Sequence, residues 1–244
     1  MLKSMLVFGM TAALAYGWKE SGPEKRLNEA ANVFEEIMKA PDKAIPQALL
    51  DKAQCVIIVP GMVKAALGIG GEYGRGFASC RVGTSSWGPP AALKLIGGSF
   101  GLQLGAQATD IVMLVMNKRG FERLLKDKFT IGGEASAAAG PVGRSAAAET
   151  DALMHAEILS WSRSRGVFAG VSLNGTVVQI DKEENAKLYG KPLTSKEILE
   201  GTIPIPETAR VLTAVLDKYA PLEAHRSRSA AKRSARRASS PPAR

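Results

Sequence analysis

The sequence predicts a single α+β domain, in which a glycine-rich curved antiparallel β-sheet or barrel-like β region is flanked by N-terminal and C-terminal helices. Three observations support this. Between Leu27 and Met38, apolar residues recur at three- and four-residue steps until Pro41. Residues 55–116 are rich in β-branched residues and glycine. Residues 207–219 return to helical spacing. Strands bounded by helices in this order indicate an α+β fold.

The first helix is expected from Glu24 to Lys39, because Ser21 and Glu24 have the spacing of a capping box. Its polar face carries at least as many acids as bases, which favours packing on a core over lying on a membrane. Further helices are expected at 47–53, 121–126, 183–189, 195–200 and 207–219.

The first strand, Cys55–Val59, is continuously apolar, so we expect it to be buried on both faces and to end at Pro60-Gly61. The glycines between 68 and 76 predict strong curvature or close backbone approach. Asn174-Gly175 predicts a two-residue hairpin turn. Further strands are expected at 78–82 and, joined by glycine turns, at 91–96, 101–107 and 110–116. Residues 157–163 and 167–173 are expected to pair in a hairpin around Ser164-Arg165-Gly166, with the Asn174-Gly175 turn starting a second hairpin.

The formal net charge is +9, from 32 basic and 23 acidic residues, and it is unevenly distributed. Residues 225–244 contain seven basic side chains and no acid, so residues 1–224 hold 25 basic and 23 acidic groups, a net of +2. We expect 225–244 to be a disordered basic tail, since it has no large apolar residue and cannot bury enough surface to fold alone. Such a tail attracts nucleic acid or anionic lipid only non-specifically; the alternative is a solubilising tail.

The N-terminus has the pattern of a signal peptide. Lys3 precedes an uncharged run up to Trp18, and Ala13-Leu14-Ala15 offers a small-x-small cleavage site. Residues 1–20 are therefore expected to be a signal peptide cleaved near Ala15, which predicts a secreted or periplasmic, membrane-associated protein. The alternatives are a buried helix or a membrane-resting anchor.

The two cysteines, Cys55 and Cys80, have two possible states. Two buried free thiols are the default, but outside the cytoplasm the pair could form a disulfide. If they pair, their Cα atoms should lie about 4.4 to 6.8 Å apart.

Three patterns suggest catalysis or ligand binding, but each lacks its required context. Gly97–Gly101 matches the Gly-x-Ser-x-Gly elbow around Ser99, with Asp110 and His155 in the order of a hydrolase triad. That elbow needs a helix directly after the serine, whereas the chain here alternates with glycine. A dinucleotide loop at Gly68–Gly74 also lacks its helix.

Metal binding has equally little support. His155 and Glu157 have no third metal ligand in view, and Glu183-Glu184 is typical of a solvated helix start. We therefore expect no enzyme activity, no cofactor and no metal site.

Residues 26–219 resemble the SYLF-domain family, also known as a yeast-type actin-binding domain family. The matching segments are Lys52–Pro60, Tyr73–Phe77, Trp87–Pro90, Ile96–Gly101, Gly132–Arg144 and, above all, Ser162–Leu173. The resemblance implies a non-enzymatic domain, here residues 21–224, that binds phosphoinositides or other anionic phospholipids at a membrane. With the expected signal peptide, it implies a bacterial envelope member.

Basic residues near glycine turns are the candidates for lipid head-group binding, because guanidinium groups and backbone N–H groups can bind phosphate together. They are Lys64, Arg75, Arg81, Arg144, Arg163 and Arg165. The alternative function is a protein-interaction scaffold, in which the same surface binds actin-like filaments or another acidic protein.

Overall fold

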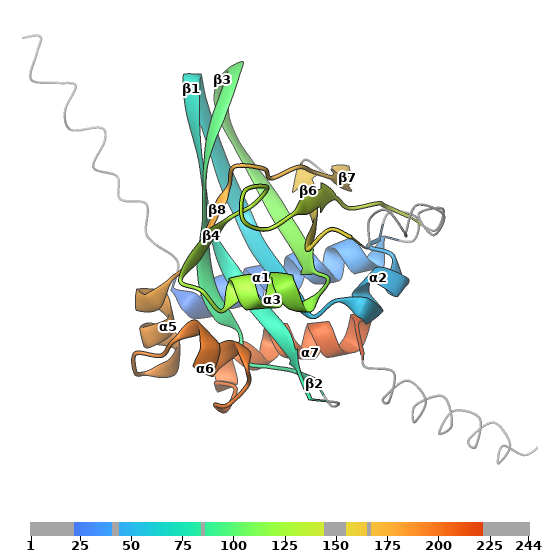
Figure 1. Cartoon of the computed structure of the whole chain (residues 1–244), viewed down its shortest axis with the longest axis vertical. Coiled ribbons are helices and arrows are strands. Elements are labelled where there is room, and N and C mark those ends of the chain that lie inside the picture. The colour runs from blue at the N-terminus through green and yellow to red at the C-terminus, as the bar shows by residue number, and fades with distance from the viewer. Residues whose placement is uncertain (1–21, 41–43, 84–85, 144–154, 165–166, 222–244) are drawn as a thin grey trace, which may run out of the picture.

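The fold is known from a computed structural model that describes residues 22–40, 44–83, 86–143, 155–164 and 167–221, apart from the side chains of 65–69 and 99–107. The expected signal peptide and basic tail lie outside the described residues. Helices from both ends of the chain pack at the base of a curled, mostly antiparallel sheet (Figure 1), which confirms the α+β fold and the curved sheet.

The helices agree well with the sequence pattern. They are α1 (Pro23–Lys39), α2 (Gln47–Lys52), α3 (Lys118–Leu124), α5 (Lys182–Tyr189), α6 (Ser195–Leu199) and α7 (Arg210–Tyr219), the last preceded by the short 3-10 helix η2 (Glu207–Ala209). Helix α1 starts with Gly22 as N-cap and Pro23 in its first turn, without a side-chain cap. None of the described helices combines the length and apolar character needed to cross a membrane.

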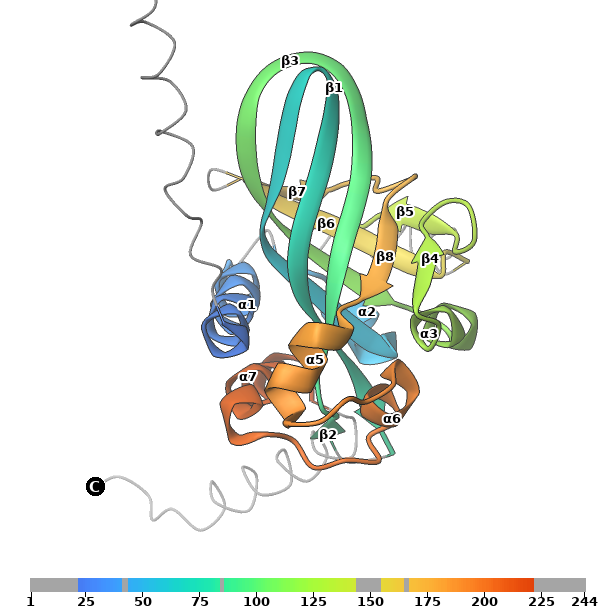
Figure 2. The same cartoon turned by 90° about the vertical axis from the view of Figure 1, so that its left-hand side faces the viewer.

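Two long strands dominate the sheet. Strand β1 (Cys55–Val82) and strand β3 (Ala91–Val115) pair in antiparallel fashion from Cys55↔Val115 to Ala78↔Ala91. The resulting ribbon rises beyond the rest of the molecule and turns over, so each strand has an ascending and a descending limb (Figure 2). We call residues 62–74 of β1 and 95–109 of β3 the arch.

The continuity of these strands corrects two predictions. Strand β1 does not end at Pro60-Gly61: it continues through a register shift between Val59 and Met62. Gly61 adopts φ +56°, and its N–H donates to Asp110 Oδ1 at 2.9 Å, which replaces the lost ladder bond. The three strands predicted between 91 and 116 are one strand, because their glycines lie in extended backbone opposite β1.

Shorter strands widen the sheet on both sides of the ribbon. They are β2 (Ser86–Trp87), β4 (Lys128–Thr130), β5 (Ala137–Ala139), β6 (Ile158–Ser164), β7 (Val167–Gly170) and β8 (Val177–Ile180). The predicted β6–β7 hairpin is confirmed by the pair Arg163↔Phe168. The second predicted hairpin is wrong: Asn174-Gly175 does form a turn, with Thr176 N donating to Leu173 O, but β8 pairs with β3 and β4 instead of β7.

The curled sheet is buried on both faces at its base. The inner face contributes Cys55, Ile57 and Val59 to one core, together with residues of β4, β6, β8 and α6. The outer face contributes Val56 and Ile58 to a second core with α1, α2 and α7. The predicted burial of Cys55–Val59 on both faces is thereby confirmed.

Glycines allow the two limbs of β1 to pack backbone against backbone. A Cβ on Gly76 would lie 2.0 Å from the carbonyl oxygen of Ile58, and one on Gly74 would lie 2.6 Å from Val59 Cγ1. Real Cβ atoms do not approach so closely, so both positions require glycine. This confirms that the glycine-rich pattern reports close backbone approach.

Candidate functional site

The base of the arch contains a network of buried ion pairs. Arg75, on β1, donates to Asp181 Oδ2 through Nη2 at 2.7 Å and through Nε at 3.1 Å. Arg75 Nη2 also lies 3.1 Å from Glu184 Oε2, and Arg26 of α1 pairs with the same carboxylate. Lys94 of β3 lies 3.3 Å from Asp181 Oδ1. The network therefore joins α1, β1, β3 and α5.

Local sequence explains how α5 presents these acids. Asp181 is the N-cap of α5, and its side chain accepts from the N–H of Glu184 at 3.2 Å. One residue further, the Asn185 amide accepts from Ala92 N and donates to Ala92 O, which fixes the helix to the start of β3. Glu184 is thus buried, which corrects the prediction of a solvated helix start; Glu183 is exposed.

The network keeps Asp181 ionised. Burial by itself raises the pKa of this carboxyl group, but the hydrogen bonds from Arg75 and from the Glu184 backbone, with the charges of Arg75 and Lys94, outweigh it. The pKa of Asp181 therefore lies below its ordinary value. The acids at this site therefore already have cationic partners within the fold.

Lys64 connects the two limbs of the arch. Its ammonium lies 2.8 Å from Glu72 Oε1, although the two residues belong to the same strand. The turn of the ribbon brings them together on its inner side. The Lys64 side chain is 34% exposed and the Glu72 side chain 11%, so the cation is the more accessible partner.

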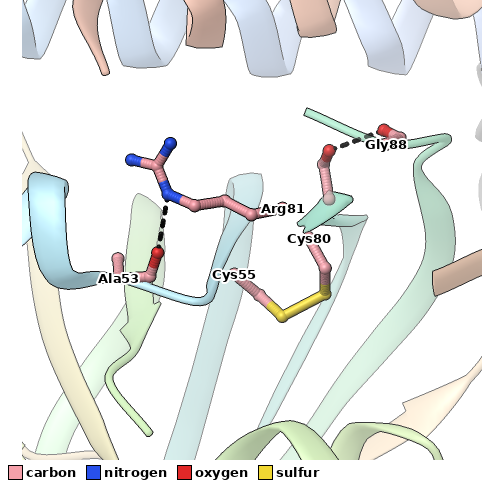
Figure 3. The surroundings of a disulfide bond; sticks show 6 residues. Ala53, Cys55, Cys80, Arg81 and Gly88 are labelled. Carbon is pink, nitrogen blue, oxygen red and sulfur yellow. Dashed lines mark hydrogen bonds between the residues drawn. A yellow bond between two sulfur atoms is a disulfide. The ribbon is translucent and has the colours of Figure 1, made fainter. Parts of the chain in front are cut away.

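Arg81 holds the end of α2 (Figure 3). Its Nε donates to Ala53 O and its Nη2 to Leu50 O, both at 2.9 Å, so it satisfies carbonyls that a helix C-terminus leaves free. The guanidinium also lies 4.4 Å from the ring centroid of Trp87. These contacts give Arg81 a structural role.

Cys55 and Cys80 are disulfide-bonded in the structure, instead of forming the free thiols taken as the default (Figure 3). Their Cα atoms are 4.0 Å apart, slightly closer than the expected range. The bond lies in the inner core and joins the two limbs of β1 at the base of the ribbon.

Arg163 is on β6, away from this network. Its Nε and Nη2 donate to Asp110 Oδ2 at 3.0 and 2.8 Å, and its Nη1 pairs with Glu36 of α1. Partial burial lowers the pKa of the guanidinium, but the two carboxylates reverse this and raise it. Arg163 therefore fixes α1 to the sheet.

The structure does not bring the described members of the six predicted head-group residues together at one site. Lys64, Arg75, Arg81 and Arg163 each have their own acid or carbonyl partners. Arg144 and Arg165 lie outside the described residues.

An exposed apolar pair was missed by the sequence reasoning. Tyr73 and Ile96 are cross-strand partners on the arch, with 47% and 40% of their surfaces exposed. The sequence does contain a signal for this pair: Tyr73 stands among glycines, a pattern that predicts curvature but also leaves a large side chain without neighbours to cover it.

Where the structure describes them, the residues considered for catalysis and metal binding have other surroundings. Asp110 binds Gly61 N and Arg163, and His155 is exposed; the side chain of Ser99 is outside those described. Gly70 and Gly74 lie within β1, so the interpretation of this stretch as a curved strand is confirmed. Among the described residues, no three His, Cys, Asp or Glu side chains gather as metal ligands.

Comparison with known proteins identifies the family. Residues 96–219, about half of the chain, match the family model Ysc84, described as "Las17-binding protein actin regulator". The chain belongs to the Ysc84 family. This confirms the SYLF resemblance found in the sequence motifs.

Curated relatives agree. Protein YSC84 of Saccharomyces cerevisiae is 32% identical over 182 residues, 73% of this chain and 39% of that protein. SH3 domain-containing YSC84-like protein 1 of Bos taurus is 30% identical over 205 residues, 82% of this chain and 60% of that protein. An SH3 domain-containing protein of Schizosaccharomyces pombe is 33% identical over 178 residues, which are 72% of this chain and 41% of that protein. The chain thus spans less than two thirds of the length of these relatives.

Proposed function

We propose that this chain is a non-enzymatic protein-binding domain whose partner is an actin-like filament or an acidic protein that regulates such filaments. The observation that carries this proposal is the match to a family described as actin regulators. Ion pairs also join α1 and α5 to the sheet, so these elements form one body that a partner can bind.

Co-sedimentation with purified actin filaments tests the proposal without any lipid present. We expect the full chain to pellet with filaments and to stay in solution alone. Microtubules, an unrelated acidic filament, are the control for simple charge attraction. Pelleting that is equal with both filaments, or that disappears at moderate salt, would contradict the proposal, since attraction between exposed charges is screened.

A second candidate function is binding to anionic membranes. It is favoured by the seven basic residues in 225–244 and by two lysines, Lys64 on the arch and Lys94 at its base, that are more exposed than their acid partners. The test is co-sedimentation with neutral, phosphatidylglycerol, cardiolipin and phosphoinositide vesicles. Equal retention on neutral vesicles would exclude an anionic preference.

We also propose that the chain is exported to a secreted or periplasmic location by residues 1–20, as in an envelope protein of bacteria. The uncharged run up to Trp18 supports this. Mass spectrometry of the protein from its native host should find a mature N-terminus after Ala15. A retained Met1 would exclude cleavage.

A further inference from the structure

The outer face of the ribbon changes character from base to tip. Cross-strand partners lie on the same face of an antiparallel pair, and the face repeats every second residue. At the base, Phe77 and Ala92 belong to the core beneath α1 and α7. The next pair on this face, Arg75 and Lys94, reaches the acids of α5.

Beyond this network the same face emerges from the cover of the helices. Tyr73↔Ile96 is the next pair, and it is the exposed pair described above. Gly71↔Gly98 follows, and then Ile69↔Phe100. The register therefore places Tyr73 and Ile96 side by side on one face, and we call this pair the arch stripe. In the sequence, Ile69 and Phe100 are the apolar residues of the pair that follows the two glycines.

The sequence of the arch contains no charge over a long stretch. Residues 65–71 on β1 and residues 95–109 on β3 lack Asp, Glu, Lys and Arg. In β3 the alternation also continues past Phe100, with Leu102, Leu104 and Ala106 at every second position. In the described part of the chain, β3 pairs only with β1 between Gly97 and Thr109, so the tip has no third strand.

Charge at the border of this stretch is biased towards cations. Lys94 lies next to Ile96 along the ribbon and is 27% exposed, whereas its partner Asp181 is 1% exposed. On the inner side, Lys64 is 34% exposed and Glu72 11%. The acid Asp110 lies further down the other limb, paired with Arg163. The sequence of the tip is therefore uncharged, and lysine ammonium groups lie at its border.

We propose that the arch stripe is a membrane-contacting element, which enters the head-group region of a lipid bilayer with Tyr73 at the boundary and the lysines near the phosphates. A tyrosine with one apolar and one polar end suits that boundary. Figures 1 and 2 show the ribbon standing clear of the helices, so a planar surface can reach it. A two-stranded ribbon has open edges that the hydrocarbon core does not tolerate, so the contact is interfacial.

This inference rests on the second candidate function, membrane binding, and assigns the element responsible. The test uses the full chain with vesicles of phosphatidylcholine alone and of phosphatidylcholine with phosphatidylglycerol. The affinity of the double variant Tyr73→Ser/Ile96→Ser for both kinds of vesicle should be at least about tenfold lower, because it loses the apolar surface that would contact the lipid. Val167→Ser, on β7, is the matched control, because Val167 is 63% exposed but lies off the arch.

A second measurement locates the contact directly. Ile96→Trp should be quenched by lipids brominated near the top of their acyl chains, whereas Val167→Trp should not; the wild-type chain gives the background from its own tryptophans. Tyr73 and Ile96 are partly exposed cross-strand partners, so their replacement should lower the urea midpoint only modestly, and urea titration must show that each variant is fully folded under the conditions of the binding assay.

The outcomes separate the two hypotheses. If the wild-type chain binds no vesicles, membrane binding itself fails. If it binds vesicles but the double variant binds equally well, or Val167→Trp is quenched as strongly as Ile96→Trp, the assignment to the arch is wrong. If the double variant instead loses filament binding, or converts a dimer to a monomer without lipid, the stripe is a protein-docking surface and the proposal is overturned.

Discussion

Breaking the Cys55–Cys80 bond should destabilise the protein by a predictable amount. The bond closes a loop with a sequence separation of 25 residues. The loop-closure relation gives about 12 cal/mol/K for that length, or about 3.5 kcal/mol at 25 °C, chiefly by restricting the unfolded chain. With an m-value of about 2.5 kcal/mol/M, the urea midpoint should fall by about 1.4 M.

Urea titration of the oxidised and the reduced wild-type protein measures this, with the fluorescence of the buried Trp87 and Trp161 as the signal. Because both cysteines are buried, a thiol count in denaturant without reductant must first show that the purified protein has no free thiol. The variant Cys55→Ala/Cys80→Ala, measured without reductant, is the second arm: it should be no more stable than the reduced protein, because it also leaves small cavities. A difference of less than about 1 kcal/mol between oxidised and reduced protein would refute the loop-closure reasoning.

Three further predictions concern backbone packing, pH and the tail. Gly76→Ala should lower the free energy of unfolding by about 3 kcal/mol or prevent folding, because the new Cβ would meet the Ile58 carbonyl oxygen. In the control Gly71→Ala the Cβ meets nothing nearer than 3.9 Å, so urea titration should find its stability close to that of the wild type. The pKa of Asp181 is lowered in the folded state, so the stability that its ionised carboxylate contributes is complete above about pH 4 and is lost as the pH falls through the folded-state pKa. Asp181→Asn should therefore be less stable than the wild type at pH 7, and its stability should fall less steeply in an acid titration. Deleting 225–244 should reduce retention on heparin or anionic vesicles at low salt and leave the thermal midpoint unchanged; an unchanged retention would show that the body carries the attraction.

The helices could be predicted because their signals are local. In α1, apolar residues at three- and four-residue steps, with Pro23 at the start and Pro41 just beyond the end, are a property of one short segment. The β6–β7 hairpin is local for the same reason, since few residues separate its strands. The family motif Ser162–Leu173 lies in the same region and is likewise readable from the chain alone.

The long strands and the site could not be predicted in this way. Gly61 and the glycines of β3 look like turns in isolation, but β1 continues through a register shift at Gly61, and the partner strand holds the glycines of β3 in an extended ladder. The partners of Arg75 are Asp181 and Glu184, more than a hundred residues away, and nothing near Arg75 in the sequence identifies them. Whether a basic residue binds a ligand or a neighbouring acid is therefore a question of tertiary packing.

The sequence by itself determined the fold class, the family and the separation of charge into a nearly neutral body and a basic tail. Composition and short-range periodicity are enough for these, because each depends on residues close together in the chain. Only the tertiary structure decided that Cys55 meets Cys80, that Lys64 meets Glu72 across the arch, and that Tyr73 and Ile96 stay exposed beyond the ion-pair network. These contacts depend on how far the ribbon bends and where the helices stop covering it, and long-range packing fixes both.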